Sequence, residues 1–316
     1  MITQVLLLAL GLILLISGAN GLVDGASALA KKFNVSDLAI GLTIVAFGTS
    51  APELVVNVFA SYQNHQDIVF ANVIGSNNFN LFIILGITGL ITPLVVQSST
   101  IWKEIPISFL GIVLVYTLTH HIFAIDNYTL TRVDGFLLLS LFVLFLYYVY
   151  KQLKTDPVVI ETKAANYSNL KMYGFILLGL AGLVIGGRLL VTSAVDLATT
   201  FSMSEKMIGL TIIAAGTSLP ELATSVVAAL KKNSDIAVGN IIGSNIFNLF
   251  FILATSAVIR PIAYDTVFDL DLYILAGGTL FVFMAMFTGK KKKLDRWEAA
   301  ILLVSYVGYI VYVIQK

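Results

Sequence analysis

Two glutamates follow prolines in segments of nearly identical sequence. Residues 48–53 read GTSAPE and residues 216–221 read GTSLPE, so that Glu53 and Glu221 occupy the same place in each segment. Both segments lie near the middle of an apolar stretch. Proline removes an intrahelical hydrogen bond and glycine weakens the helix around it, so each stretch is predicted to be a helix broken at this point. If these helices cross a membrane, a carboxylate placed there indicates a functional site.

Further oxygen donors follow each glutamate. Residues 72–80 read NVIGSNNFN and residues 240–248 read NIIGSNIFN. Ser76 and Asn80 are spaced i, i+4, so they share one helix face. Carboxylates, hydroxyls, amides and carbonyls are the ligands that Ca²⁺ and Na⁺ prefer. The chain has no cysteine, and its three histidines fall at loop positions, which argues against zinc or copper.

The charge of these donors limits the cargo. All other Asp and Glu residues fall near the ends of predicted spans or in loops, so the two glutamates alone give the deep site a charge of −2. One Ca²⁺ or two Na⁺ would balance it. Purely structural explanations exist for each feature: protonated, hydrogen-bonded glutamates, and small or amide residues that pack helices together in membranes. A matched pair of glutamates in two broken helices favours the cation site.

The composition indicates that these helices lie in a membrane. The 316 residues are 58% hydrophobic and 12% charged, with a mean hydropathy of +0.93, whereas soluble domains carry about 25% charged residues. The net charge of +1 gives no indication of nucleic-acid binding. No basic segment precedes the first apolar stretch, so that stretch is predicted to be a retained helix and not a signal peptide.

Hydropathy and turn signals predict ten membrane spans. Their expected limits are 3–27, 37–61, 67–91, 104–122, 132–151, 171–197, 205–230, 235–259, 270–288 and 297–314. If both termini lie outside, the inside segments hold 14 Lys and Arg residues and the outside segments hold four. This bias is the positive-inside pattern, so we expect a multi-pass protein of the cell membrane with the N- and C-termini outside.

The two glutamates belong to an internal duplication. Residues 41–93 and 209–261 align without a gap at an offset of 168, with 28 identities over 53 positions. We therefore divide the chain into a first five-helix half (1–152), a cytoplasmic linker (153–170) and a second five-helix half (171–316). Because five is odd, the second half is expected to lie inverted in the membrane. Inverted repeats are typical of secondary transporters, with the site at the repeat interface near the midplane. A duplicated scaffold without transport is the alternative.

The paired GTS-x-PE and GSN-x-FN motifs resemble the α-repeats of sodium/calcium exchangers in the cation/Ca²⁺ antiporter superfamily. The resemblance covers nearly the whole chain. It implies an all-α membrane protein with ten transmembrane helices in two inverted five-helix repeats. Spans two, three, seven and eight would surround the cation sites, and spans one and six would slide across them. The metal-binding residues that it implies are Thr49, Ser50, Glu53, Ser76, Asn80, Thr217, Ser218, Glu221, Ser244 and Asn248, with the carbonyls of Ala46 and Ala214 at outer sodium sites.

The resemblance also implies an activity: exchange of Na⁺ for Ca²⁺ by alternating access, with no cofactor, no obligate protein partner and the lipid bilayer as surroundings. Potassium-dependent relatives carry Asp where this chain has Asn248, so we expect exchange without K⁺. The proton/calcium exchangers are the alternative, but they typically carry a further acid in the third and eighth spans, which is missing here.

Two other classes fit less well. An intramembrane protease would need two aspartates able to share a proton, whereas the deep acids here are glutamates beside prolines. We therefore expect no enzymatic activity. A channel would share the deep polar residues, and saturable flux that depends on a counter-ion would distinguish an exchanger from it.

Overall fold

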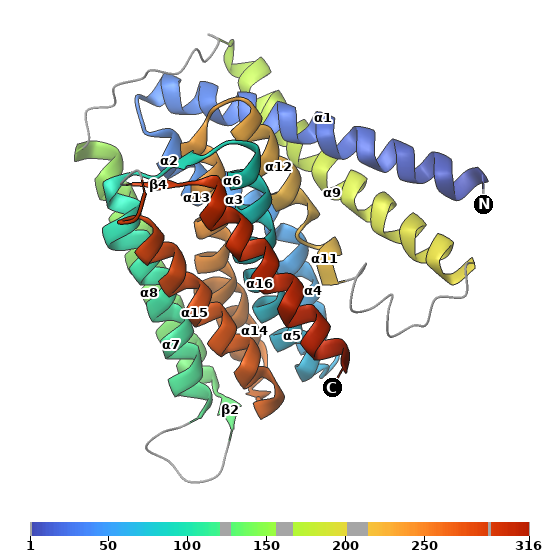
Figure 1. Ribbon diagram of the computed structural model, residues 1–316, viewed down its shortest axis with the longest axis vertical. Coiled ribbons are helices and arrows are strands. Elements are labelled where there is room, and N and C mark those ends of the chain that lie inside the picture. The colour runs from blue at the N-terminus through green and yellow to red at the C-terminus, as the bar shows by residue number, and fades with distance from the viewer. Residues whose placement is uncertain (1, 121–127, 156–166, 201–213, 290–291, 316) are drawn as a thin grey trace.

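The computed structural model describes residues 2–120, 128–155, 167–200, 214–289 and 292–315, and it is built almost entirely of helices (Figure 1). In chain order they are α1 (Ile2–Phe33), α2 (Asp37–Ile40), η1 (Gly41–Val45), α3 (Ala46–Thr49), α4 (Ala51–Tyr62), α5 (Gln66–Asn78), η2 (Phe79–Ile84), α6 (Leu85–Ile91), η3 (Thr100–Glu104), α7 (Ile105–Thr119), α8 (Arg132–Thr155), α9 (Asn169–Thr200), α11 (Ala214–Gly216), α12 (Leu219–Leu230), α13 (Ser234–Phe247), η5 (Asn248–Ile252), α14 (Leu253–Ile259), η6 (Thr266–Phe268), α15 (Asp269–Ala285) and α16 (Arg296–Gln315). The segments η1, η2, η3 and η5 are π-helical, and η6 is a 3₁₀ turn.

Eight helices in the described part of the chain are long and apolar enough to cross a membrane. They are Thr3–Phe33, Gln66–Ile91, Thr100–Thr119, Arg132–Gln152, Asn169–Leu197, Ser234–Ile259, Thr266–Ala285 and Arg296–Val313. These helices confirm eight of the predicted spans, with small shifts at the ends. The first runs six residues beyond its predicted limit of residue 27, because Lys31 and Lys32 in its last turn suit a helix C-terminus.

The predicted second and seventh spans are the two with proline near the middle. The second is a bent pair, Asp37–Thr49 and Ala51–Tyr62, with an angle of 48° between its halves. This confirms the predicted break. Of the predicted seventh span, residues 205–213 lie outside the described residues, and the remainder forms α11 and α12.

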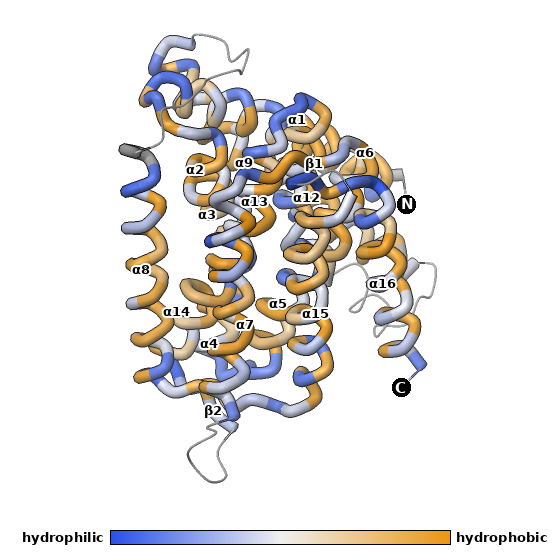
Figure 2. The backbone as a smooth tube through the Cα atoms, turned by 60° about the vertical axis from the view of Figure 1, so that its left-hand side comes forward, coloured by the Kyte–Doolittle hydropathy of each residue, from blue (hydrophilic) through white to orange (hydrophobic). Residues whose placement is uncertain are grey.

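Two spans form the centre of the bundle and the others surround them. In the most apolar window of Ser234–Ile259, 94% of residues are buried inside the protein, and in Gln66–Ile91 67% are buried, against at most 39% in the other spans. Figure 2 shows apolar residues along the outer helices as well, for example on α8 and α15. Apolar side chains therefore lie both in the interior and on the outer surface of the bundle. This distribution is expected for a helical bundle that is surrounded by lipid.

The two longest helices, α1 and α9, lie side by side and tilted against the rest of the bundle (Figure 1). Glycines line their contact. A Cβ atom added to Gly18 would lie 2.7 Å from the carbonyl oxygen of Gly179, and one added to Gly11 would lie 2.8 Å from the carbonyl oxygen of Gly186. Only glycine permits this approach, as in other membrane helix pairs that use small residues.

The two halves of the chain are joined by reciprocal contacts at the ends of the bundle. Strand β1 (Leu94–Val95) pairs antiparallel with β4 (Lys293–Leu294), and β2 (Thr129–Leu130) pairs antiparallel with β3 (Ile262–Ala263). Each pair therefore takes one strand from each half.

Two arginine side chains also connect the two halves of the chain. Arg132 Nε donates to the Val258 carbonyl at 3.2 Å, and Arg296 Nε donates to the Leu90 carbonyl at 3.0 Å. The two carbonyls are 168 residues apart in the sequence and lie in the last turns of α14 and α6. The last carbonyls of a helix have no partner within the helix, so each arginine caps a helix of the opposite half.

Candidate cation site

The two glutamates lie at equivalent breaks in the helices. Ser50 (φ −83°, ψ 8°) separates α3 from α4, and Ser218 (φ −88°, ψ 8°) precedes α12. A proline occupies the first turn of each following helix, where its missing N–H costs nothing. Glu53 and Glu221 therefore lie in the first turns of α4 and α12, where the helix dipole stabilises negative charge. Both side chains are buried.

Each glutamate is held by a serine of the opposite half. Ser50 Oγ donates to Glu221 Oε1 at 2.8 Å, and Ser218 Oγ donates to Glu53 Oε1 at 3.2 Å. Ser244 Oγ also lies 3.4 Å from Glu221 Oε1 and 3.0 Å from Ser50 Oγ. The structure thus joins five of the predicted residues in two hydrogen-bonded groups, each of which spans both halves of the chain.

Several buried oxygens in this region have no hydrogen-bond partner within the protein. They are Glu53 Oε2, Glu221 Oε2, Ser76 Oγ, Asn80 Oδ1 and Asn248 Oδ1, all in residues predicted to bind metal. A buried polar atom without a partner costs free energy, about 1–3 kcal/mol and more for a charged group. The donor set consists entirely of hard oxygens, so a cation of the calcium or sodium type would satisfy these atoms.

Two asparagines orient two of these ligands. Asn80 donates to Asn245 Oδ1 at 3.1 Å, and Asn248 donates to Asn77 Oδ1 at 2.9 Å. Asn77 and Asn245 also donate to each other's backbone carbonyls, both at 3.4 Å. Because the amide nitrogens of Asn80 and Asn248 are held in this way, their oxygens remain available. The sequence reasoning did not identify this positioning role for Asn77 and Asn245.

The threonines of the GTS motifs contact asparagines of the other half. Thr49 Oγ1 donates to Asn240 Oδ1 at 3.0 Å, and Thr217 Oγ1 donates to Asn72 Oδ1 at 3.4 Å. Asn72 and Asn240 also donate to the backbone carbonyls of Glu53 and Glu221, respectively. The threonines therefore steady the segments that carry the glutamates.

The carbonyl of Ala46, one of the two predicted outer positions, lies within hydrogen-bond distance of two groups in this conformation. The Ala46 carbonyl accepts from the Ser50 N–H at 3.0 Å and from Thr49 Oγ1 at 3.3 Å. Ala214, its counterpart, begins α11.

The predicted set leaves out one buried polar residue that lies close to Glu221. Thr224, one turn after Glu221, is buried with no partner for its hydroxyl. Its counterpart at an offset of 168 is Val56, so the duplication gave no signal for it. Glu104 and Glu298 are also buried inside the protein, but their positions near span ends are those predicted for acids outside the deep site. They accept hydrogen bonds from Tyr148 and Thr288, respectively, and lie near helix ends.

A cavity of about 410 Å³ adjoins the site between α4, α9 and α12. Pro52, Thr217 and Pro220 line it next to the glutamate segments, and its walls are mostly apolar. Arg188 also lines the cavity and makes no hydrogen bond or ion pair with the described residues. The cavity places open space beside the buried oxygens.

The family model for the sodium/calcium exchanger protein matches residues 3–151 and 171–315. The chain belongs to this family. CaxA of Alkalimonas amylolytica is 40% identical over 318 residues, with 98% of both chains covered. The sodium/calcium exchanger MaX1 of Methanosarcina acetivorans is 31% identical, with 97% of both chains covered. Among solved structures, the sodium-calcium exchanger NCX_Mj soaked without Na⁺ and Ca²⁺ superposes with a TM-score of 0.83 at 31% identity over 99% of both chains.

Membership of the exchanger family confirms the resemblance drawn from the motifs, and with it an all-helical, multi-pass membrane protein. Across the described residues, no group of three or more His, Cys, Asp or Glu side chains could hold a metal ion. Glu53 and Glu221 are the two acidic members of the candidate site, and its remaining predicted donors are neutral oxygens.

Proposed function

We propose that this chain is a secondary-active antiporter that exchanges Na⁺ for Ca²⁺ by alternating access, at a site formed by Glu53 and Glu221. The observation that carries the proposal is the position of the two carboxylates. Each carboxylate comes from a different half of the chain, and its Oε1 accepts a hydrogen bond from a serine of the other half. Each also retains a buried Oε2 without a hydrogen-bond partner.

The donor set supports Ca²⁺ and Na⁺ as cargo. Ca²⁺ takes about 6–8 oxygen ligands in flexible geometry. The two carboxylates, Ser76, Asn80 and Asn248 supply unpartnered oxygens. The serine and threonine hydroxyls of the GTS motifs and the carbonyls of Ala46 and Ala214 complete the proposed set. The relative MaX1 is named a sodium/calcium exchanger, and NCX_Mj structures were obtained with Na⁺ and Sr²⁺.

The charge of the site supports exchange over leak. Two carboxylates close together in a low dielectric repel each other strongly when no cation lies between them. An empty site therefore reorients poorly, whereas a site neutralised by one Ca²⁺ or two Na⁺ reorients readily. After Ca²⁺ is released, the site can then return to the other side of the membrane only with a counter-ion bound.

The proposed architecture is an inverted 5+5 bundle of ten transmembrane helices with both termini outside, divided as 1–152, 153–170 and 171–316. Reciprocal hydrogen bonds between residues that differ by 168, such as Asn77 with Asn245, support the two-fold relationship. The glycine contact between α1 and α9 leaves these two helices packed chiefly on each other, which suits the sliding pair.

The counter-ion and the role of K⁺ follow from the same residues. Asn248 contributes a neutral amide where potassium-dependent exchangers carry a carboxylate, so we propose exchange without K⁺. Proton/calcium exchange is the alternative. Spans three and eight contain no acid near the site in this chain: Asp67 and Asp235 lie in the first turns of α5 and α13.

The test is ⁴⁵Ca²⁺ uptake into proteoliposomes that contain purified protein. Uptake is expected when the vesicles are loaded with Na⁺, whether or not K⁺ is present. Uptake driven by an outward proton gradient but not by Na⁺ would establish the alternative. A steady ion current without any counter-ion would instead show a channel.

A further inference from the structure

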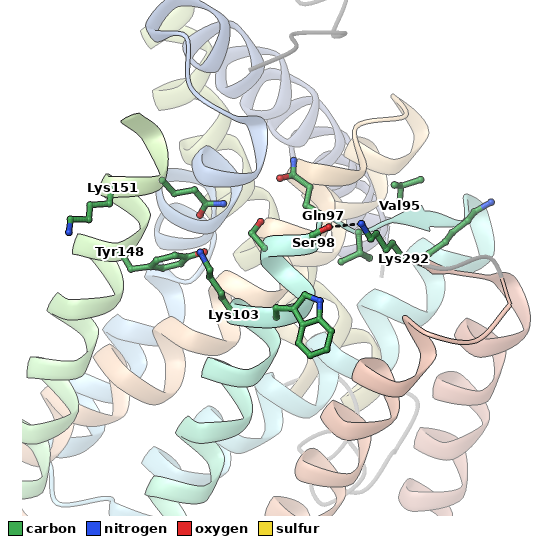
Figure 3. A pocket seen from close by; sticks show the side chains of 12 residues that line it. Val95, Gln97, Ser98, Lys103, Tyr148, Lys151 and Lys292 are labelled. Atoms are coloured by element: carbon green, nitrogen blue, oxygen red, sulfur yellow. Dashed lines mark hydrogen bonds between the residues drawn. The ribbon is translucent and has the colours of Figure 1, made fainter. Parts of the chain in front are cut away.

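A basic pocket lies away from the candidate cation site, at the end of the bundle that carries β1 and β4. It has a volume of about 1020 Å³ and opens between the end of α8, the start of η3 and the β4 segment. Figure 3 shows its side chains. Its described lining residues are Val95, Val96, Gln97, Ser98, Ser99, Trp102, Lys103, Tyr148, Lys151, Gln152, Lys292 and Lys293. Four of these are lysines and none is acidic.

The lysines come from three separate segments. Lys103 belongs to η3 and places its ammonium 4.9 Å from the centre of the Tyr148 ring. Lys292 lies across the pocket and donates to Ser98 Oγ at 2.7 Å. Lys151 and Lys293 also line the pocket, and Lys293 Nζ is 3.6 Å from Asp295 Oδ1. In Figure 3 the Lys103 side chain points toward Tyr148 and that of Lys292 toward Ser98, and both lysines line the pocket.

The chemistry of the lining fits a phosphate group. Ammonium groups and serine hydroxyls donate hydrogen bonds to phosphate oxygens, and no carboxylate in the described lining repels an anion. The nearest buried acid, Glu104, accepts a hydrogen bond from Tyr148, and Asp235 accepts one from Gln97 at 2.6 Å. Both acids are therefore engaged with neutral partners of the pocket wall.

The location identifies the kind of molecule that carries the phosphate. The pocket lies at the ends of membrane-spanning helices, where lipid headgroups lie, and exposed apolar side chains border it: Trp102 is 62% exposed and Val95 is 59% exposed. Tryptophan is enriched at this level of the membrane. Basic pockets between transmembrane helices bind the headgroups of anionic lipids. We propose that this pocket binds the phosphate headgroup of an anionic phospholipid, held between Lys103 and Lys292.

The test measures lipid binding to the whole purified protein, so its outcome is separate from that of the transport assay. Native mass spectrometry would count phosphatidylglycerol and phosphatidylcholine molecules retained at increasing lipid concentration. The wild type is expected to retain phosphatidylglycerol in preference to phosphatidylcholine. Equal retention of the two lipids would overturn the proposal, and this comparison needs no variant.

A double variant locates the site. Lys103→Gln with Lys292→Gln is expected to weaken phosphatidylglycerol binding roughly thirtyfold. Each basic residue near the membrane surface strengthens binding of an anionic lipid by about fivefold, and the double variant loses two of them. The matched control is Lys31→Gln with Lys32→Gln, which removes the same charge at the end of α1, outside the pocket. An equal loss in the control variant would overturn the site.

A competition experiment distinguishes binding of a lipid from binding of a soluble phosphate. Inorganic phosphate and glycerol 3-phosphate are added as competitors to the wild type with phosphatidylglycerol bound. Persistence of the bound lipid at millimolar competitor supports a lipid site, because the acyl chains add apolar contacts that the soluble anions lack. Complete displacement would show that the pocket takes the free anion and would overturn the lipid assignment.

Discussion

The hydroxyl of Ser50 lies 2.8 Å from Oε1 of Glu221, so a residue of the first half of the chain orients the carboxylate of the second half. The reverse contact, from Ser218 to Glu53, is 3.2 Å long. Neither half contains a complete set of contacts for its own glutamate. The candidate cation site therefore forms only when the two halves are assembled around it.

Replacement of either glutamate is expected to abolish exchange. Glu53→Gln and Glu221→Gln each remove one of the two charges that balance Ca²⁺, and we expect Na⁺-dependent ⁴⁵Ca²⁺ uptake to fall at least about a hundredfold, roughly 3 kcal/mol. Glu104→Gln is the matched control, because Glu104 is equally buried but contacts Tyr148 instead of the site. Full exchange in either site variant would refute the two-carboxylate site.

The positioning role of Asn77 can be separated from ligand binding by a double-mutant cycle. Asn77→Ala removes the acceptor of the Asn248 amide, so the Asn248 oxygen loses its orientation. We expect the KM for Ca²⁺ to rise about tenfold, in line with the loss of second-shell support at metal sites. In an Asn248→Ala background the same change should have little further effect. Additive effects would show that Asn77 acts independently of Asn248.

The neutral amide of Asn248 is expected to set the independence from K⁺. Asn248→Asp adds a third carboxylate to the site, and the extra charge calls for one more monovalent cation beside Ca²⁺. Ca²⁺ exchange by this variant is therefore expected to increase when K⁺ replaces choline in the assay, whereas the wild type should not respond. A variant that is active and equally insensitive to K⁺ would contradict this assignment.

The contact between α1 and α9 should tolerate no side chain at its centre. Gly18→Leu would place carbon atoms where the Gly179 carbonyl lies, and we expect a loss of stability of about 1–3 kcal/mol, as for other overpacked contacts. The control is Gly174→Leu on α9, where an added Cβ meets nothing within 4 Å. Melting temperature in detergent and exchange rate would be measured for both. A Gly18 variant as stable and as active as the control would show that the helices separate freely here.

The sequence predicted the parts of the site that the duplication repeats. Glu53, Ser76 and Asn80 stood out because Glu221, Ser244 and Asn248 occur at the same offset, and the prolines predicted the break that the structure has at Ser50. Apolar residues occur both where a helix faces lipid and where it is buried in the protein. Hydropathy could therefore locate the spans, but it could not show which spans pack against each other.

What the sequence could not show depends on how helices meet. The amides of Asn77 and Asn245 face each other only because α5 and α13 cross at the centre of the bundle, and π-helical turns at η2 and η5 change the face that later residues present. The burial of Glu104 depends on Tyr148, which is 44 residues away in the sequence. Such contacts leave no local pattern.

The crossed contacts made by Arg132, Arg296 and the two strand pairs have a mechanical consequence. A force applied to one end of the chain cannot extract one half without also breaking the caps and strands that it shares with the other. Pulled from the bilayer, the protein should therefore unravel in one cooperative event that involves both halves, and a stable intermediate with one intact half should be absent from the force trace.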